Sequence, residues 1–185
     1  MDDSELICST RCHKGLTITE WTNSEGKLFR MNGPARILTY NDKRTELNQG
    51  IAKKEQWCQK PNEHYRKNDK PSEIHYFENN SIASEKWIYL NRFFRDNDEP
   101  AVINYYKKEG KSSLYGIDMI LGVDVPKFKS KFWVDGYGQT HRKDGPAAIF
   151  YNEDGEIVEV EFYEYGNFIK TCNDREELRR FAIYG

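Results

Sequence analysis

The four tryptophans of this chain share one local setting, in which a proline follows thirteen or fourteen residues later. The pairs are Trp21 and Pro34, Trp57 and Pro71, Trp87 and Pro100, and Trp133 and Pro146. Each interval contains an arginine, and an isoleucine stands three residues after each proline: Arg30, Arg66, Arg95 and Arg142, then Ile37, Ile74, Ile103 and Ile149. A spacing that recurs along a chain is typical of repeat proteins, whose units complete their core against their neighbours.

The last unit has the residue pattern of a β-hairpin. Asp144-Gly145 before Pro146 favours a turn, because Asp bonds its own backbone, Gly accepts a positive φ, and Pro fixes φ at the start of a strand. Apolar residues then alternate on each side of the turn residues 152–155, first Ala147, Ile149 and Tyr151, then Val158, Val160 and Phe162. This alternation predicts two strands, each with one buried face.

We therefore predict a mainly β chain, in which stacked antiparallel hairpin repeats form a single meandering sheet. Its length of 185 residues suits one domain, 1–185, with units at about 21–56, 57–86, 87–132 and 133–172. The final segment, 173–185, is expected to form a short capping helix, because Asn173 or Asp174 can accept the first free amides and acids precede bases along it. This helix is expected to close the open end of the array.

The string His141-Arg142-Lys143-Asp144-Gly145-Pro146-Ala147, followed by Tyr151, Gly155 and the segment 162–166, resembles the degenerate MORN-type repeats of small phage and bacterial proteins. Counted as recurring units, the resemblance spans roughly residues 17–170. It is close in the fourth unit, whereas the second and third units have Lys70 and Glu99 in place of the glycine and one residue more after the arginine. It implies stacked β-hairpins with interaction surfaces, and no single activity.

Charge is distributed unevenly. Residues 27–70 contain eleven Lys and Arg against five acids, a net of +6, whereas residues 135–185 contain six against eleven, a net of −5. Such a field orients encounters with charged partners and could favour self-association. No long apolar run is present and the first residues are acidic, so we expect a cytoplasmic protein without membrane attachment.

The sequence contains no pattern typical of catalysis. No phosphate-binding glycine loop, nucleophile elbow or paired metal motif is found, so we predict a non-enzymatic protein without a cofactor. Cys8, Cys12 and His13 have the spacing of a partial metal site but no second close pair, and reduced structural thiols are the preferred interpretation. His141 takes a position filled by Phe29, Tyr65 and Phe94 in the other units, which indicates packing.

Two sets of residues are candidates for partner binding. The third unit is the longest and carries an apolar insertion, and the first half of the chain has a basic stretch. The candidates are Tyr115, Ile117, Met119, Ile120 and Leu121 in the insertion, and Lys53, Lys54, Arg66 and Lys67 in the basic stretch. The four arginines of the repeat are expected to bind carbonyls or acids, or to stack on the tryptophans.

The preferred function is protein recognition by a small inhibitor or adaptor that docks on a larger complex, in the sharpest form a phage-encoded inhibitor of a bacterial defence protein. Nucleic-acid binding is an alternative, with Trp57, Tyr65 and Tyr40 as a stacking platform beside the basic residues. A third is a small-molecule or nucleotide sponge, which the sequence does not separate from the first.

Overall fold

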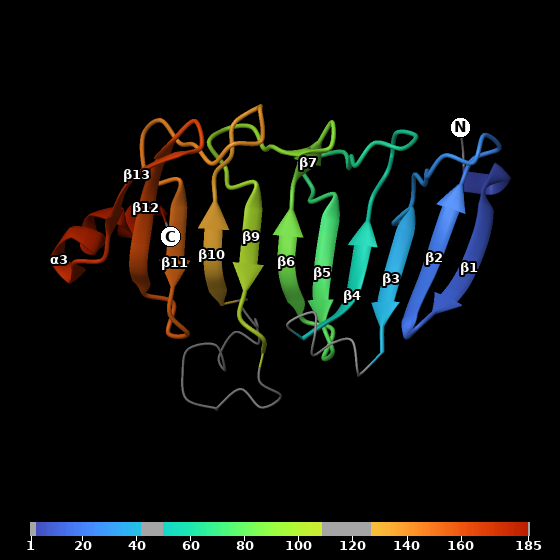
Figure 1. Cartoon of the computed structure of the whole chain (residues 1–185), viewed down its shortest axis with the longest axis horizontal. Coiled ribbons are helices and arrows are strands. Elements are labelled where there is room, and N and C mark those ends of the chain that lie inside the picture. Colours follow the sequence, from blue (N-terminus) through green and yellow to red (C-terminus); the bar gives the residue numbers. More distant parts are fainter. Residues whose placement is uncertain (1–2, 42–49, 109–126, 185) are drawn as a thin grey trace.

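The computed structural model describes residues 3–41, 50–108 and 127–184 and has one 11-stranded antiparallel sheet (Figure 1). The sheet order is that of the chain, β1 through β6 and then β9 through β13, while β7 and β8 form a separate two-stranded ladder. The strands are β1 Ile7–His13, β2 Leu16–Thr22, β3 Arg36–Tyr40, β4 Ile51–Gln56, β5 Glu73–Phe77, β6 Ile82–Lys86, β7 Ile88–Tyr89, β8 Arg92–Phe93, β9 Val102–Tyr105, β10 Phe128–Phe132, β11 Ala148–Tyr151, β12 Ile157–Glu164 and β13 Asn167–Cys172. The predicted fold class, a mainly β chain of antiparallel hairpins in one meandering sheet, is confirmed.

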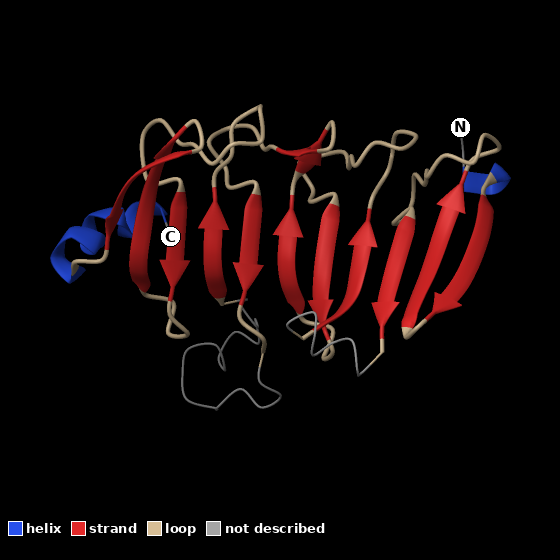
Figure 2. Cartoon of the chain, in the orientation of Figure 1, coloured by secondary structure: helices blue, strands red, loops and turns tan. Residues whose placement is uncertain are grey.

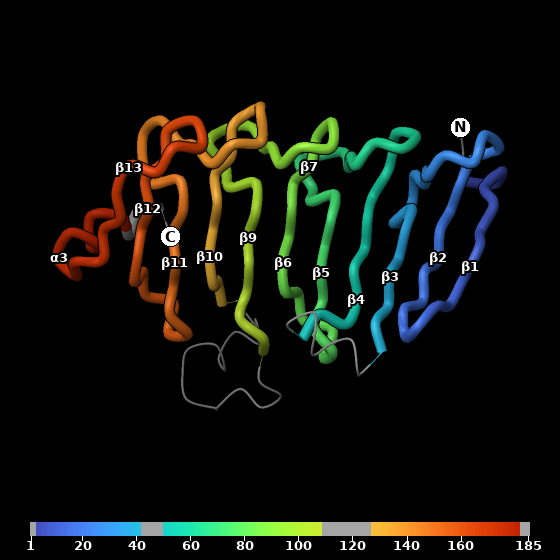
Figure 3. The backbone as a smooth tube through the Cα atoms, viewed as in Figure 1, coloured from blue at the N-terminus to red at the C-terminus, as the bar shows by residue number. Residues whose placement is uncertain are grey.

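The two ends of the strands carry different connections. The Trp-to-Pro intervals form long loops at one edge, the upper edge in Figures 1 and 3, which we call the motif edge: 23–35, 57–72, 87–101 and 133–147. The opposite edge holds tight turns, including Lys14-Gly15, where both residues have positive φ as a two-residue hairpin turn requires. The repeat motif is therefore concentrated along one side of the molecule.

Residues paired between neighbouring strands form rows of side chains that cross each face of the sheet. On one face, which we call the isoleucine face, the row runs Ile37, Glu55, Ile74, Glu85, Ile103, Lys131, Ile149, Val160. On the other, which we call the Glu73 face, it runs Glu20, Arg36, Gln56, Glu73, Lys86. The isoleucine that follows each proline thus recurs at the same height in every unit.

The apolar core is densest at the C-terminal end of the isoleucine face. Trp133, Ile149 and Val160 are buried together with Leu178 of α3, Arg175–Leu178. The Asp174 side chain accepts the amides of Glu176 and Glu177, as predicted for its cap. The short helix and the 3-10 turn Arg179–Tyr184 contact β12, so the cap covers part of the sheet (Figure 2). Residues 167–171 of β13, the last strand, remain exposed.

The predicted alternation in β12 is wrong at one residue. Val158 was expected on the buried face but is 43% exposed, whereas Ile157 packs against the core. The ladder between β11 and β12 shifts register between Phe150 and Tyr151, because a bulge admits one extra residue and reverses the sides of those beyond it. An equivalent shift lies between His75 and Tyr76 in the second unit.

Among the described residues, the short helical segments are neither long nor apolar enough for any of them to cross a membrane.

Candidate functional site

Each repeat unit builds the same stack at the motif edge, with an arginine guanidinium over the indole of its tryptophan. The distances from Cζ to the ring centroid are 4.0 Å for Arg30 on Trp21, 3.5 Å for Arg66 on Trp57, 3.9 Å for Arg95 on Trp87 and 4.0 Å for Arg142 on Trp133. A guanidinium over an aromatic face is attracted by the ring quadrupole. At Gly33 a Cβ would lie 2.7 Å from Arg30 Cζ, so a larger residue there would push the guanidinium from its present position.

Backbone hydrogen bonds hold each tryptophan between two parts of its own loop. Its amide donates to the residue after the proline, as from Trp133 to Ala147 O at 2.8 Å, and its carbonyl accepts from the amide of the aromatic-type residue, as from His141 at 3.1 Å. The same pair of bonds recurs for Trp21, Trp57 and Trp87. The long loops are thus fixed by the sheet that they connect.

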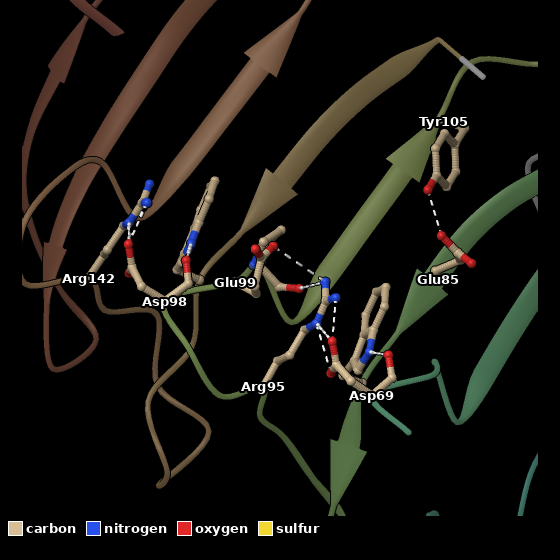
Figure 4. A network of polar contacts seen from close by, with 10 residues as sticks. Asp69, Glu85, Arg95, Asp98, Glu99, Tyr105 and Arg142 are labelled. Atoms are coloured by element: carbon tan, nitrogen blue, oxygen red, sulfur yellow. Dashed lines mark hydrogen bonds and ion pairs between the residues drawn. The ribbon is translucent and has the colours of Figure 1, made fainter. Parts of the chain in front are cut away.

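The third and fourth units are joined by side chains across the motif edge. Arg142 Nε and Nη2 donate to the carboxylate of Asp98, at 2.9 and 2.6 Å to its two oxygens, and Trp133 Nε1 donates to the Asp98 carbonyl at 2.8 Å (Figure 4). We call this arrangement the interunit junction. One aspartate thereby binds both members of the next unit's stack.

The second and third units repeat the junction. Arg95 binds the Asp69 carboxylate with a shortest distance of 2.7 Å, Trp87 Nε1 donates to the Asp69 carbonyl at 3.0 Å, and Glu99 lies 3.7 Å from the same arginine (Figure 4). In these two units the extra residue after the arginine makes Asn68-Asp69 and Asn97-Asp98 consecutive left-handed pairs. Asn and Asp tolerate that region better than other side chains. Gly33 and Gly145 do not have a positive φ, so the positive φ predicted for the glycine before Pro146 is wrong, and the first and fourth units make this turn without a left-handed pair.

The first and second units meet differently. Asn32 stands where the later units have the aspartate, and Trp57 Nε1 is buried without a hydrogen-bond partner among the described residues. The contact is made instead by Gln59 Nε2, which donates to Met31 O at 2.6 Å, and by Arg30 N, which donates to Cys58 O at 3.1 Å.

A groove of about 460 Å³ opens at the motif edge between the second and third units. Its aromatic wall consists of Tyr65, Tyr89 and Phe94, whose rings follow one another with centroids 6.5 and 6.4 Å apart. Lys60 Nζ lies 4.7 Å from the Tyr65 ring centroid, and Tyr89 is 43% exposed. Tyr65 and Phe94 are half-buried. A row of partly exposed rings beside a cation is suited to holding a flat or aromatic group of a partner.

The small β7–β8 hairpin separates this groove from a second hollow of about 370 Å³. Its turn places Leu90 and Asn91 at positive φ, so that Tyr89 lines the groove while Arg92 and Phe93 line the hollow. Burial lowers the pKa of His64, which also lines the hollow.

The Glu73 face carries a buried ion cluster. Glu73 receives Lys54 Nζ at 2.8 Å, Lys86 Nζ at 3.1 Å, His75 Nε2 at 2.8 Å and Gln56 Nε2 at 3.1 Å. Burial alone would raise the pKa of Glu73, but the hydrogen bonds from His75 and Lys54 and the charge of Lys86 outweigh it and hold that pKa well below its usual range. The cluster is already saturated by its own side chains, which indicates a structural role.

Replacement of Glu73 by Gln should destabilise the chain at pH 7 by about 2 kcal/mol, because the half-buried ammonium groups of Lys54 and Lys86 lose their counter-charge. The folded pKa of Glu73 lies below the unfolded value of about 4.3, so its contribution is complete above that value and is lost as pH falls through the folded pKa. Urea unfolding should therefore show the gap between wild type and Glu73→Gln shrinking by about 1–2 kcal/mol from pH 7 to pH 3. A gap that widens toward acid would contradict the ion-cluster assignment.

Three tyrosines occupy equivalent places on the isoleucine face. Tyr76 donates to Glu55 at 2.9 Å, and Tyr105 donates to Glu85 at 2.6 Å, in each case on the adjacent strand. Figure 4 shows the second of these bonds. The Tyr151 hydroxyl is buried with no hydrogen-bond partner among the described residues, because Lys131 occupies the corresponding strand position.

This difference predicts opposite effects of the same substitution. Tyr105→Phe should cost about 1.5–3 kcal/mol through loss of a bond to a carboxylate, whereas Tyr151→Phe should stabilise by about 1 kcal/mol by removing an unpaired buried hydroxyl. Thermal or urea unfolding of the two variants tests this, and equal losses in both would refute it.

The basic residues that the sequence suggested for partner binding do not form one patch in the structure. Lys53 and Lys54 are neighbours on β4 and so point to opposite faces, where they pair with Glu55 and Glu73. Arg66 stacks on Trp57, and Lys67 lies exposed in the following turn. Tyr115, Ile117, Met119, Ile120 and Leu121 lie outside the described residues. The proposed stacking platform is not assembled, because Tyr40 lies at the far end of β3 from Trp57 and Tyr65.

The cysteines do not form a described metal centre. Cys8 and Cys12 are exposed on β1, Cys58 and Cys172 are buried, and no group of three metal-ligating side chains occurs within residues 3–41, 50–108 and 127–184. Burial raises the pKa of Cys58 to about 11, so its thiol stays protonated at neutral pH.

Comparison with known proteins does not relate the chain to a family. No protein-family model matches the chain, and the search of curated proteins finds no match. The resemblance to MORN-type repeats stays a prediction.

Proposed function

We propose that this chain is a recognition module that binds a partner protein through the groove between its second and third units. The observation that carries the proposal is the row of Tyr65, Tyr89 and Phe94 at the motif edge, in which Tyr89 is exposed and the other two rings are half-buried. Tyrosine and arginine dominate the energetic centres of protein interfaces, where a few rings provide most of the binding energy.

The loops around the groove are held in place before any partner arrives. Tyr65 and Phe94 donate their amides to the carbonyls of Trp57 and Trp87, and Arg95 closes one side of the groove by binding Asp69. A binding surface that is already ordered loses little conformational entropy on association. This favours recognition on a rigid scaffold over folding upon binding.

The charges around the groove are mixed. Arg66 and Lys70 lie beside Asp69 and Asp96 in its lining, and Lys60 is paired with Glu63 at 3.9 Å. A nucleic-acid site would need a continuous cationic track for the phosphates. The mixed pattern suits a protein surface better.

The test is capture of partners on the immobilised full chain from lysate of its source cells, with Tyr89→Ala as the binding variant. Tyr165→Ala is the matched control, since Tyr165 is an exposed tyrosine at a positive-φ turn position in the last unit. We expect one protein captured in stoichiometric amount by wild type and control and lost with Tyr89→Ala. Its identity also tests the proposed inhibition of a bacterial defence protein.

Two further measurements separate the alternatives. Single-stranded DNA and RNA at low salt should bind weakly and equally to wild type and Tyr89→Ala. Nucleotides in a thermal-shift assay should leave the melting temperature unchanged, whereas a bound ligand at 100 times its dissociation constant adds about 2.7 kcal/mol. Nucleic-acid or nucleotide binding that disappears in Tyr89→Ala would overturn the protein-recognition proposal.

A further inference from the structure

Strand β1 forms an open edge of the sheet. Within the part of the chain that the structure describes, no strand pairs with its outer side, and all seven of its residues are exposed (Figure 1). Asp3 accepts the amides of Met31 and Asn32 at 2.7 and 2.9 Å, which ties the preceding residues to the motif edge and leaves β1 uncovered. Soluble proteins usually protect such an edge with several charges, a proline or a bulge, whereas β1 has Arg11 as its one Lys, Arg, Asp or Glu residue and pairs with β2 without a bulge.

The free backbone groups of β1 can be assigned from its neighbour. Trp21 N donates to Ala35 O, on the β3 side of β2, at 2.8 Å, so Trp21 and the alternate residues of β2 direct their amides away from β1. Cys8 lies opposite Trp21, and Thr10 and Cys12 lie opposite Thr19 and Thr17. In an antiparallel ladder the amides and carbonyls of Cys8, Thr10 and Cys12 consequently point to the open side.

We propose that a second copy of this chain pairs with β1, antiparallel, about a two-fold axis at Thr10. This register pairs all seven residues: Thr10 faces Thr10 of the second copy, and Cys8 faces its Cys12. The three residues with outward backbone groups then bond to one another, and the two sheets become one. The dimer is closed, because the same strand serves both copies.

Charge complementarity favours this register. Arg11 Nη2 binds Glu20 Oε2 of its own chain at 3.1 Å, and its side chain is still 65% exposed. In this register Arg11 faces Ser9 of the second copy, which lies opposite that copy's Glu20 on β2. The small serine leaves the guanidinium a path to this second carboxylate as well, and symmetry repeats the arrangement. A register centred on Arg11 would instead place two guanidinium groups opposite each other, and like charges directly across a ladder destabilise it.

The arrangement of the two cysteines provides a test specific to the register. Paired residues across the axis have Cα atoms about 5.5 Å apart, whereas Cys8 and Cys12 of one chain are about 13 Å apart. A short thiol-reactive cross-linker should therefore join wild-type chains into dimers. Cys8→Ser alone and Cys12→Ser alone should give no dimer, and an equimolar mixture of the two variants should restore it.

A second variant tests the pairing without thiol chemistry. Thr10→Pro removes one outward amide, and proline is tolerated where the amide faces solvent at a sheet edge. This variant should keep the wild-type circular dichroism and sediment as a monomer under conditions where wild type is a dimer. A monomeric wild type, a cross-linked dimer of Cys8→Ser alone, or a ladder of trimers and larger species would each overturn the proposal, the last by showing open, head-to-tail association.

Discussion

Trp133→Ala should reduce the free energy of unfolding by about 3–5 kcal/mol. This is a large part of the roughly 5–15 kcal/mol by which a folded domain is usually stable. Trp133 is 4% exposed and belongs to the cluster with Ile149, Val160 and Leu178. Its removal leaves a cavity beneath Arg142 and takes away the indole donor to the Asp98 carbonyl. Urea unfolding measured by circular dichroism provides the value.

Trp133→Phe separates packing from hydrogen bonding. Phenylalanine keeps an aromatic face for Arg142 but loses the bond from Nε1 to Asp98 O, so we expect a loss of about 1–2 kcal/mol. If the alanine and phenylalanine variants were equally unstable, the hydrogen bond and not the buried ring would be the main contribution of this residue.

Asp98→Ala should cost about 2 kcal/mol, because it removes the carboxylate from Arg142, whose side chain is 6% exposed. The aspartate itself is 58% exposed, which places the effect below that of breaking a fully buried pair. The loss is measured as a shift of the urea midpoint.

Two aspartates serve as comparisons for Asp98→Ala. Asp69→Ala should cost about 1 kcal/mol, since Arg95 keeps Glu99 at 3.7 Å, and Asp154→Ala, in an exposed hairpin turn, should change stability by less than about 0.5 kcal/mol. Equal effects in all three variants would mean that the interunit junction contributes nothing specific.

The sheet and its repeat order follow from local patterns in the sequence. The turn at 152–155 is predicted from its residue types between two alternating runs, and in the structure the Asn152 side chain accepts the amides of Asp154 and Glu156. The strands between the turns were predicted from alternation, which is a property of neighbouring residues. The bulge beside Tyr151 has no such local signal and changed the face of Val158.

The interunit junction could not be predicted from local patterns in the sequence. Arg95 and Asp69 are 26 residues apart, and Arg142 and Asp98 are 44 apart, so their pairing depends on how the loops lie along the motif edge. Aspartate recurs before the proline in the sequence, but its ability to bond its own backbone in a turn already accounts for it there. A charged turn residue combined with a recurring arginine is the signal that could have identified the pair.

The groove was missed for a related reason. Tyr89 belongs to the β7–β8 hairpin, whose two-residue strands are too short to give a periodic pattern, and its turn uses Leu90, which is uncommon at positive φ. β1 was also missed, because Ile7–His13 is largely polar and exposed on both faces.

The most direct test of the proposed function is the dissociation constant of the captured protein for wild type, Tyr89→Ala and Tyr165→Ala, measured by titration calorimetry. If the groove is the centre of the interface, Tyr89→Ala should weaken binding about 30-fold or more, equivalent to about 2 kcal/mol, while Tyr165→Ala stays within about two-fold of wild type. Equal dissociation constants for wild type and Tyr89→Ala would contradict the assignment of the groove as the recognition site.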